Sequence, residues 1–297
     1  MMLDFVDDEC RRTDWGHLLL TLTTGSNGAL NFSRINPLTL STGDILLFLY
    51  MLIRQDGDFL IPYLHDLIRF ADKPFSYLDA GENVPMVIDE ILRRFRSAVY
   101  TGEDRERYED LRLAQAKIQE NIDRRVETMG SGSRREQTVL PRLEWLADIG
   151  VLCKQAGGIR SYWMSERGKL FCERIYADYV HFAEEGFPEE ATVRLLDRRF
   201  FHLAHDLLYK EANLQAPGDV ISFVAPGYAR LKSSTGYCVG KTLLLLSHNL
   251  GWESGRPDTL EYDSARRSLE DAYQADPNRF YYTTARFGED FQIRLEK

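Results

Sequence analysis

Long apolar runs are missing from this 297-residue sequence. The longest, Ile45 to Ile53, is flanked by Asp44 and Arg54, and it is much shorter than the roughly 20 residues of a membrane-spanning helix. The first residues also lack a basic stretch followed by an apolar one. We therefore expect no membrane span and no secretory signal.

Cysteine is scarce as well. The four cysteines, at positions 10, 153, 172 and 238, lie far apart, and none has the C-x-x-C spacing of a metal or redox site. Secreted domains held together by disulfides have a much higher cysteine density. We expect a reducing, cytoplasmic compartment, and we expect no cofactor and no bound metal.

Positive charge is in deficit. The chain carries 37 Lys and Arg against 46 Asp and Glu, a net charge of −9, which argues against nucleic acid as a partner. Residues 134–174 are the exception, with eight basic and five acidic side chains. Because salt screens charges beyond about 10 Å, local charge decides whether a surface faces phosphates. An excess this small also arises by chance. The pattern of the residues must therefore decide whether this segment faces phosphates.

What remains is the composition of an ordinary folded protein, with 44% hydrophobic and 28% charged residues, which excludes disordered and fibrous classes. Residues 15–35 alternate around a Gly-Ser-Asn-Gly cluster and predict a hairpin. A helix over 41–54 is apolar nearly all round, as in a core helix or a dimer contact. Asp56-Gly57-Asp58 should end it, and a second helix should cover 59–70.

Apolar residues at helical spacing predict further helices over 86–100 and 103–129. The second of these has a narrow apolar stripe that fits one partner helix, in a hairpin or a subunit contact. A helix over 134–149 should follow, then a short extended piece from Val151. Gly157-Gly158 should turn the chain into a strand over 159–165, and a last helix should cover 169–183.

The segment L-x-x-L-A-D-I-G-V-L, followed by a strand, a glycine turn and R-S-Y-W-M-S-E-R-G-K, resembles the recognition helix and wing of the winged helix-turn-helix superfamily. The resemblance covers 134–171. The helices over 41–54 and 59–70 would be the earlier helices of that domain, with a helical insertion between. Helix-prone residues 225–250 and 262–275, then strands at 280–284 and 291–295, repeat the pattern more loosely.

The expected fold class is therefore mainly α with small β-wings, in tandem winged helix-turn-helix units joined by helices. The expected parts are an N-terminal hairpin segment (1–36), a winged-helix domain (37–183) with an insertion at about 74–133, a helical connector (184–216) and a second winged-helix-like domain (217–297).

The resemblance implies double-stranded DNA as the partner, since recognition helices place their N-terminal residues at base edges. The candidate contacts in the helix are Arg134, Arg135, Gln137, Thr138 and Arg142, and those in the wing are Arg160, Ser161 and Tyr162. Arginine grips guanine or phosphate and glutamine reads adenine, while a wing enters the minor groove or follows the backbone.

A possible second contact surface consists of Arg266, Arg267, Arg279 and Arg286, which are interleaved with acidic residues. That mixture suits dimerisation or a protein partner as well as phosphate. We predict a non-enzymatic DNA-binding protein, a regulator or a subunit of a DNA-acting complex, which forms a homodimer or binds a protein partner.

Other functions compete with this one. Winged helices also serve as protein-docking modules, so an adaptor within a multi-subunit complex is the first alternative. A metal-dependent phosphohydrolase of the HD type, using His181, His205 and Asp206, is the third. Gly236 to Thr242 is similar to a phosphate-binding P-loop but has three residues between its glycines instead of four. We expect a helix to start there instead.

Overall fold

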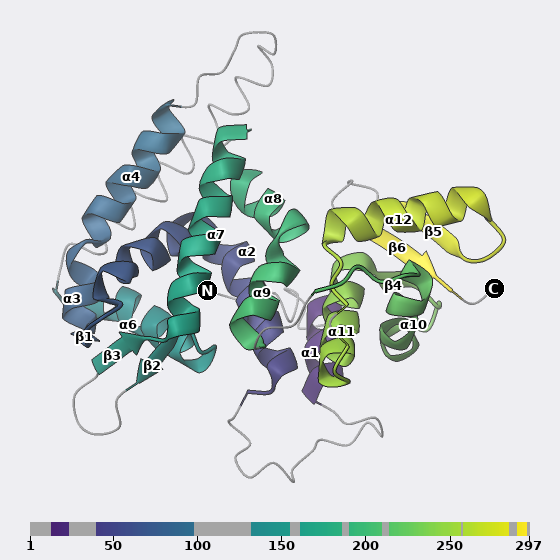
Figure 1. The fold of residues 1–297 in the computed structure, drawn as a ribbon, viewed down its shortest axis with the longest axis horizontal. Helices are drawn as coiled ribbons and strands as arrows, with labels where there is room; N and C mark the ends of the chain where they lie inside the picture. Colours follow the sequence, from purple (N-terminus) through teal and green to yellow (C-terminus); the bar gives the residue numbers. More distant parts are fainter. Residues whose placement is uncertain are drawn as a thin grey trace. The chain divides into compact units, whose positions relative to one another are not determined.

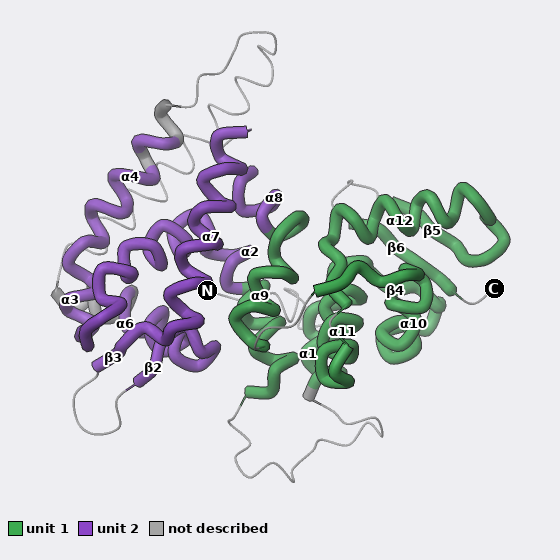
Figure 2. Tube along the Cα trace, in the orientation of Figure 1, with its two compact units in different colours: residues 1–51, 196–297 green, residues 52–195 purple. Residues whose placement is uncertain are grey.

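The structure is a computed structural model, shown in Figure 1. It describes residues 13–23, 40–97, 132–154, 161–185, 190–209, 214–256, 258–284 and 290–295. The chain is mainly helical with two small antiparallel sheets, as expected. It divides into two compact units, coloured in Figure 2: unit 1 contains residues 1–51 and 196–297, and unit 2 contains residues 52–195.

Helix α2 (Thr42–Leu67) is continuous where the sequence predicted two helices. The expected break at Asp56-Gly57-Asp58 is wrong, because contacts within unit 2 use each of these residues in helical form. Asp56 binds Arg142, and Asp58 accepts a hydrogen bond from Thr192 Oγ1 at 2.5 Å. A Cβ at position 57 would lie 2.6 Å from Thr192 Cγ2, so the absent side chain lets Thr192 approach. Most apolar side chains of α2 are buried, as in a core helix.

In unit 2, α2 is followed by a short sheet-and-helix arrangement. The elements are η1 (Ile68–Phe70), β1 (Phe75–Ser76), α3 (Tyr77–Glu82), α4 (Val84–Ser97), α6 (Gly132–Asp148), β2 (Leu152–Lys154), β3 (Ser161–Met164) and α7 (Glu166–Glu185). The predicted helix–strand–strand–helix order from 134 to 183 is confirmed. The predicted helix over 103–129 and the turn at Gly157-Gly158 lie outside the described residues.

Strand β3 is the central strand of the first sheet, whose order is β1-β3-β2. Phe75 faces Tyr162 across the sheet, and Leu152 faces Met164. These four side chains are buried, which gives the sheet one core face. Strand β1 leads directly into α3, which begins with a capping box between Ser76 and Asp79.

In unit 1 the predicted N-terminal hairpin is wrong over its first strand, because α1 (Asp14–Thr23) is a helix. Thr13 Oγ1 accepts a hydrogen bond from the Gly16 N–H, and Leu18 is completely buried. The apolar stretch that suggested alternation is the packed face of a helix that contacts α10 and α11. Residues 24–36 lie outside the described part.

The rest of unit 1 is built from α9 (Phe200–Leu208), α10 (Val220–Leu231), β4 (Cys238–Val239), α11 (Gly240–Glu253), α12 (Tyr262–Ala275), β5 (Tyr281–Thr284) and β6 (Phe291–Arg294). Helix α8 (Ala191–Arg198) runs from unit 2 into unit 1. The single helical region predicted over 225–250 is two helices with β4 between them. The predicted helix at 262–275 and the two strands after it are confirmed.

The two sheets have the same connectivity. We call residues 52–97 and 132–164 the first module, and residues 220–294 the second module. In each, a helix leads to a short strand, further helices follow, and two more strands complete the sheet with the last strand in the centre (β1-β3-β2 and β4-β6-β5). Among the described residues of the second module, no helix corresponds to α4.

Within the described ranges, no helix has both the length and the apolar composition that a bilayer crossing requires. Cys153, Cys172 and Cys238 are free thiols, and Cys10 lies outside those ranges.

Candidate nucleic-acid interface

The expected base contacts lie in the first half of α6. The backbone of α6 begins at Gly132, so Arg134, Arg135, Gln137 and Thr138 occupy its first two turns. Their side chains lie outside the described part of the structure. Their placement at a helix N-terminus is nevertheless the arrangement that base and phosphate contacts require.

Arg142 has a different position from the one expected. Its Nε lies 2.8 Å from Asp56 Oδ2, and its guanidinium lies over the Phe59 ring at 5.0 Å. The side chains of Arg142 and Asp56 are 16% and 4% exposed. Loss of Arg142 would remove a charged partner from a buried carboxylate, so this arginine joins α6 to α2. The expected role of Arg142 in DNA contact is thereby corrected.

The three contacts expected in the wing differ in how far they are described and how deeply they are buried. Arg160 lies outside the described residues, and Ser161 is half-buried and pairs with Ser76 in the sheet. Tyr162 is completely buried, and its hydroxyl donates to Glu144 Oε1 at 2.5 Å. Tyr162 therefore belongs to the core, and its expected role in DNA contact is wrong.

The exposed aromatic residue of this strand is Trp163, which is 39% exposed. Trp163 is not among the contacts predicted from the sequence, although the alternation of the strand points to it. Successive side chains of a strand point to opposite faces, so a core face containing Met164 and Tyr162 turns Trp163 outward.

The arginines of the possible second surface are all in or next to the second module. Arg267 Nε donates to the Asp263 carbonyl one turn earlier in α12, and Arg279 lies 3.3 Å from Asp219 at the start of α10. Arg266 is half-buried on the same helix. Arg286 lies outside the described residues. The described arginines are spread along α12 and the loop after it, and two of them bind groups of their own unit.

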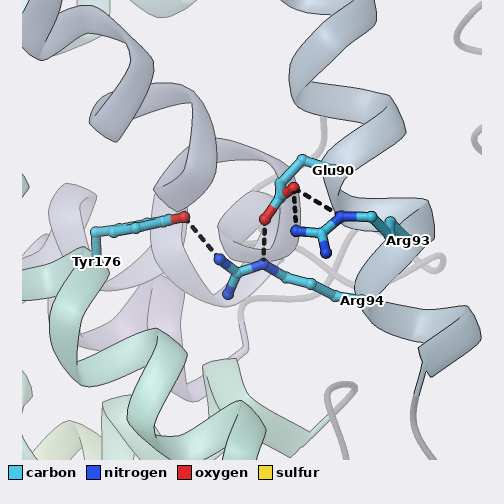
Figure 3. A network of polar contacts seen from close by, with 4 residues as sticks. All are labelled: Glu90, Arg93, Arg94 and Tyr176. Carbon is cyan, nitrogen blue, oxygen red and sulfur yellow. Dashed lines mark hydrogen bonds and ion pairs between the residues drawn. The ribbon is translucent and has the colours of Figure 1, made fainter.

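A polar network joins helix α4 to helix α7 (Figure 3). Glu90 accepts hydrogen bonds from Arg93 at 2.7 Å and from Arg94 at 2.9 Å, and Arg94 donates to the Tyr176 hydroxyl at 2.7 Å. The bond from Arg93 is the main cause that holds the pKa of Glu90 below its usual range. Tyr176 also stacks on His65 at 3.8 Å. These contacts fix α4 against α7, while Arg93 remains 73% exposed.

The P-loop-like segment is filled by the protein itself. Lys241 lies in the first turn of α11, as expected of a helix start, and its N–H donates to Asp290 Oδ2 at 3.3 Å. Its ammonium group lies 3.4 Å from Asp197 and 4.9 Å from the centre of the Tyr262 ring. A carboxylate thus occupies the place at the helix N-terminus where a phosphate would bind.

The histidines of α9 and α11 have structural partners. His202 Nδ1 lies 2.6 Å from Glu261, which also accepts the Phe201 N–H. His205 is 3% exposed and packs against Tyr209 and Trp252. Burial lowers its pKa.

His248 is completely buried, with Nδ1 donating to the Leu244 carbonyl and Nε2 accepting the Leu260 N–H. In the part of the chain that the structure describes, no group of three His, Cys, Asp or Glu side chains has an arrangement that would hold a metal ion. His181 lies in unit 2, whereas His205 and Asp206 lie in unit 1.

No protein-family model, no curated protein and no solved structure matches this chain.

Proposed function

We propose that this chain binds double-stranded DNA through tandem winged-helix modules, as a non-enzymatic regulator or a subunit of a DNA-acting complex. The observation that carries the proposal is the shared connectivity of the two modules, in which a central last strand completes a small antiparallel sheet after a helix. This is the order of elements that a winged helix-turn-helix domain has, and the sequence of 134–171 resembles the same domain.

In this proposal α6 is the recognition helix of the first module. Arg134, Arg135, Gln137 and Thr138 are the base and phosphate contacts, since they occupy the helix start. Arg160 precedes β3 in the sequence and Ser161 is the first residue of that strand, and both would contact the DNA backbone. Arg142 and Tyr162 are no longer members of the interface, because they support α6 and the sheet from inside.

The protein-docking alternative is favoured by a specific observation in the second module. Arg267 and Arg279 bind the Asp263 carbonyl and the Asp219 carboxylate. Arginines held by internal partners suit a protein surface better than a phosphate surface. The second module is therefore the candidate contact for a homodimer or a protein partner, with the cytoplasm as the proposed compartment.

Fluorescence anisotropy of a labelled random duplex of about 30 base pairs tests the proposal, at about 50 and 200 mM salt. We expect affinity to fall about 100-fold or more between these concentrations, because several arginines would displace counterions. Arg135→Glu should abolish binding at the lower salt. Arg93→Glu is the matched control, since it reverses an exposed arginine on α4 outside the proposed interface.

Absence of binding at the lower salt, or equal losses in the two variants, would refute DNA contact by the isolated chain. The adaptor alternative predicts that result together with a stoichiometric complex on affinity purification. Light scattering of the purified chain gives the oligomeric state in the same buffers.

A further inference from the structure

The sheet of the second module turns one row of side chains away from its core. Tyr282, Phe291 and Ile293 are buried, and the alternate positions of the same strands are half-buried or exposed. The outward side chains of the three strands and the residue before β4 are Tyr237, Val239, Tyr281, Thr283, Gln292 and Arg294. None of them is acidic.

Two tyrosines and an arginine form a cluster at one end of this row. Tyr281 on β5 is directly opposite Arg294 on β6, and Tyr281 is 43% exposed. The ring of Tyr237 lies 5.5 Å from the ring of Tyr281, edge to face at 84°. The Arg294 guanidinium lies 6.0 Å from the centre of the Tyr237 ring. We call Tyr237, Tyr281 and Arg294 the aromatic cluster.

The segments that form the aromatic cluster carry basic residues and no acidic ones. The stretch 230–239 and strands β5 and β6 contain the basic residues Arg230, Lys232 and Arg294 and no aspartate or glutamate, in a chain of net charge −9. Arg230 and Lys232 are exposed at the end of α10. A local cationic surface of this kind is complementary to a polyanion.

Among polyanions, the two tyrosine rings favour one with unpaired bases. Unpaired bases stack on exposed aromatic rings, whereas a duplex keeps its base faces inside its own stack. An acidic peptide would use the cations and leave both rings without a stacking partner. The nearest loop hydroxyls, Ser233 and Thr235, bind each other at 2.8 Å, and Ser233 also accepts the Tyr237 N–H. On the outward row, the Thr283 hydroxyl donates to the Thr284 carbonyl at 3.2 Å. These three described hydroxyls all have partners in the chain itself, so none is set aside for a ribose 2′-hydroxyl.

We propose that the aromatic cluster and its flanking cations are a docking site for single-stranded DNA, with bases stacked on Tyr281 and Tyr237 and the phosphates beside Arg294 and Lys232. The site is separate from the proposed duplex interface, since it uses the sheet face of the second module and not the start of α6. Its place in the fold is the sheet formed by β4, β6 and β5 in Figure 1.

Fluorescence anisotropy with a labelled oligothymidylate of about 12 nucleotides at about 50 mM salt tests this site on the full chain. Tyr281→Ala should weaken binding about tenfold, because one stacking surface is lost. Tyr281→Phe keeps the ring and should bind as the unchanged protein does. Arg294→Ala should weaken binding and reduce its salt dependence. Arg93→Ala, which removes an exposed arginine of unit 2, is the control and should change nothing.

Competition with unlabelled oligouridylate, a matched duplex and polyglutamate identifies the ligand class. Equal affinity of oligothymidylate for the unchanged protein, Tyr281→Ala and Arg294→Ala would overturn the proposal. Tighter binding of the duplex, of the RNA or of polyglutamate, with the same sensitivity to Tyr281→Ala, would also overturn it.

The duplex experiment separates this proposal from the function proposed above. Arg135→Glu should abolish duplex binding and leave oligothymidylate binding intact, while Tyr281→Ala should weaken oligothymidylate binding about tenfold and leave duplex binding intact. Failure of one proposal therefore leaves the other open to its own test.

Discussion

The two modules share one connectivity, but the residue that binds the N-terminus of the second helix is local in one module and distant in sequence in the other. In the first module α3 follows β1, and its N-terminus is capped by Ser76 and Asp79 from its own first turn. In the second module α11 follows β4 without a side-chain cap, and Asp290 from the start of β6 accepts the Lys241 N–H instead. The same geometry is thus obtained once from local sequence and once from a residue 49 positions away.

Their outward faces also differ at matched positions of the central strand. Trp163 in β3 and Arg294 in β6 each follow a buried residue paired to the first strand of their sheet, Tyr162 and Ile293. The residue opposite is Cys153 in the first module and Tyr281 in the second. A shared backbone therefore carries Trp163 opposite Cys153 in one module and Arg294 opposite Tyr281 in the other. Connectivity alone does not determine what each module binds.

The largest expected effect concerns α7, the helix that directly follows the first module in the chain. A Cβ at position 168 would lie 1.9 Å from the Val151 carbonyl oxygen, a backbone atom that cannot move aside cheaply. We expect Gly168→Ala to lower the free energy of unfolding by about 3 kcal/mol or more, measured by urea denaturation. The second module has no described helix after β6 and no such dependence.

Gly81→Ala in α3 is the control for Gly168→Ala. A Cβ there meets Val139 Cγ2 at an ordinary 3.6 Å, so the helix should gain stability by up to about 1 kcal/mol. Similar losses in both variants would show that the contact between Gly168 and Val151 is not what limits α7.

The second prediction tests the two ways of holding a helix start. Asp290 accepts the N–H groups of Lys241 and Phe291 and the hydroxyl of Tyr262. Asp290→Ala leaves these donors without their acceptor and should cost about 2–3 kcal/mol of unfolding free energy. Ser76→Ala removes a local cap and should cost about 1 kcal/mol. Equal losses, measured by thermal denaturation, would contradict the contrast between long-range and local capping.

The same contrast explains how far the sequence predicts the fold. The helix, two strands and helix between 134 and 183 are correctly predicted because their signals, helical spacing and glycine turns, are local. The break expected at Asp56-Gly57-Asp58 is wrong because the partners Arg142 and Thr192 lie 86 and 134 residues away. Turn residues in a single sequence do not show that such partners will keep them helical.

For the candidate interface, sequence reasoning found residue types but not their orientation. Arg142 and Tyr162 have side chains suited to DNA contact, yet the first pairs with Asp56 and the second is buried. Alternation along β3 would have identified Trp163 as the exposed residue. Tyr237, Tyr281 and Arg294 are distant in sequence and become neighbours only through the register of β4, β6 and β5.

The third prediction concerns the loss of stability at low pH that a buried histidine of α11, His248, should cause. Burial lowers the pKa of His248 to about 3. Because the unfolded state takes up a proton near pH 6.5 and the folded state does not, stability falls as the pH drops below that value. This group alone should cost about 2 kcal/mol between pH 7 and pH 5.

Urea denaturation at the two pH values measures the change. His248→Gln should be less stable at pH 7, since it loses the ring that stacks on Phe201, but should show a smaller loss on acidification. His181→Gln, at a position that is 60% exposed on α7, should retain the full loss. An unchanged loss in His248→Gln would contradict the assignment of the acid sensitivity to this histidine.

The smallest expected effect has the opposite sign and comes from the start of the same helix. Lys241 is the second residue of α11 and binds Asp197, whereas the second residue of α3 is Leu78, which is 63% exposed. Burial raises the pKa of Asp197 to about 6, and Lys241 opposes part of that rise. The folded state therefore holds a proton that the unfolded state releases, so this group adds stability as the pH falls through 6. The gain should be about 1 kcal/mol between pH 7 and pH 5, and it partly offsets the loss from His248.

Asp197→Asn should remove the gain and steepen the acid loss, while Asp271→Asn on the exposed face of α12 should not. If Asp197→Asn leaves the acid loss unchanged, the carboxylate is ionised throughout this range and makes no contribution to the pH dependence of stability.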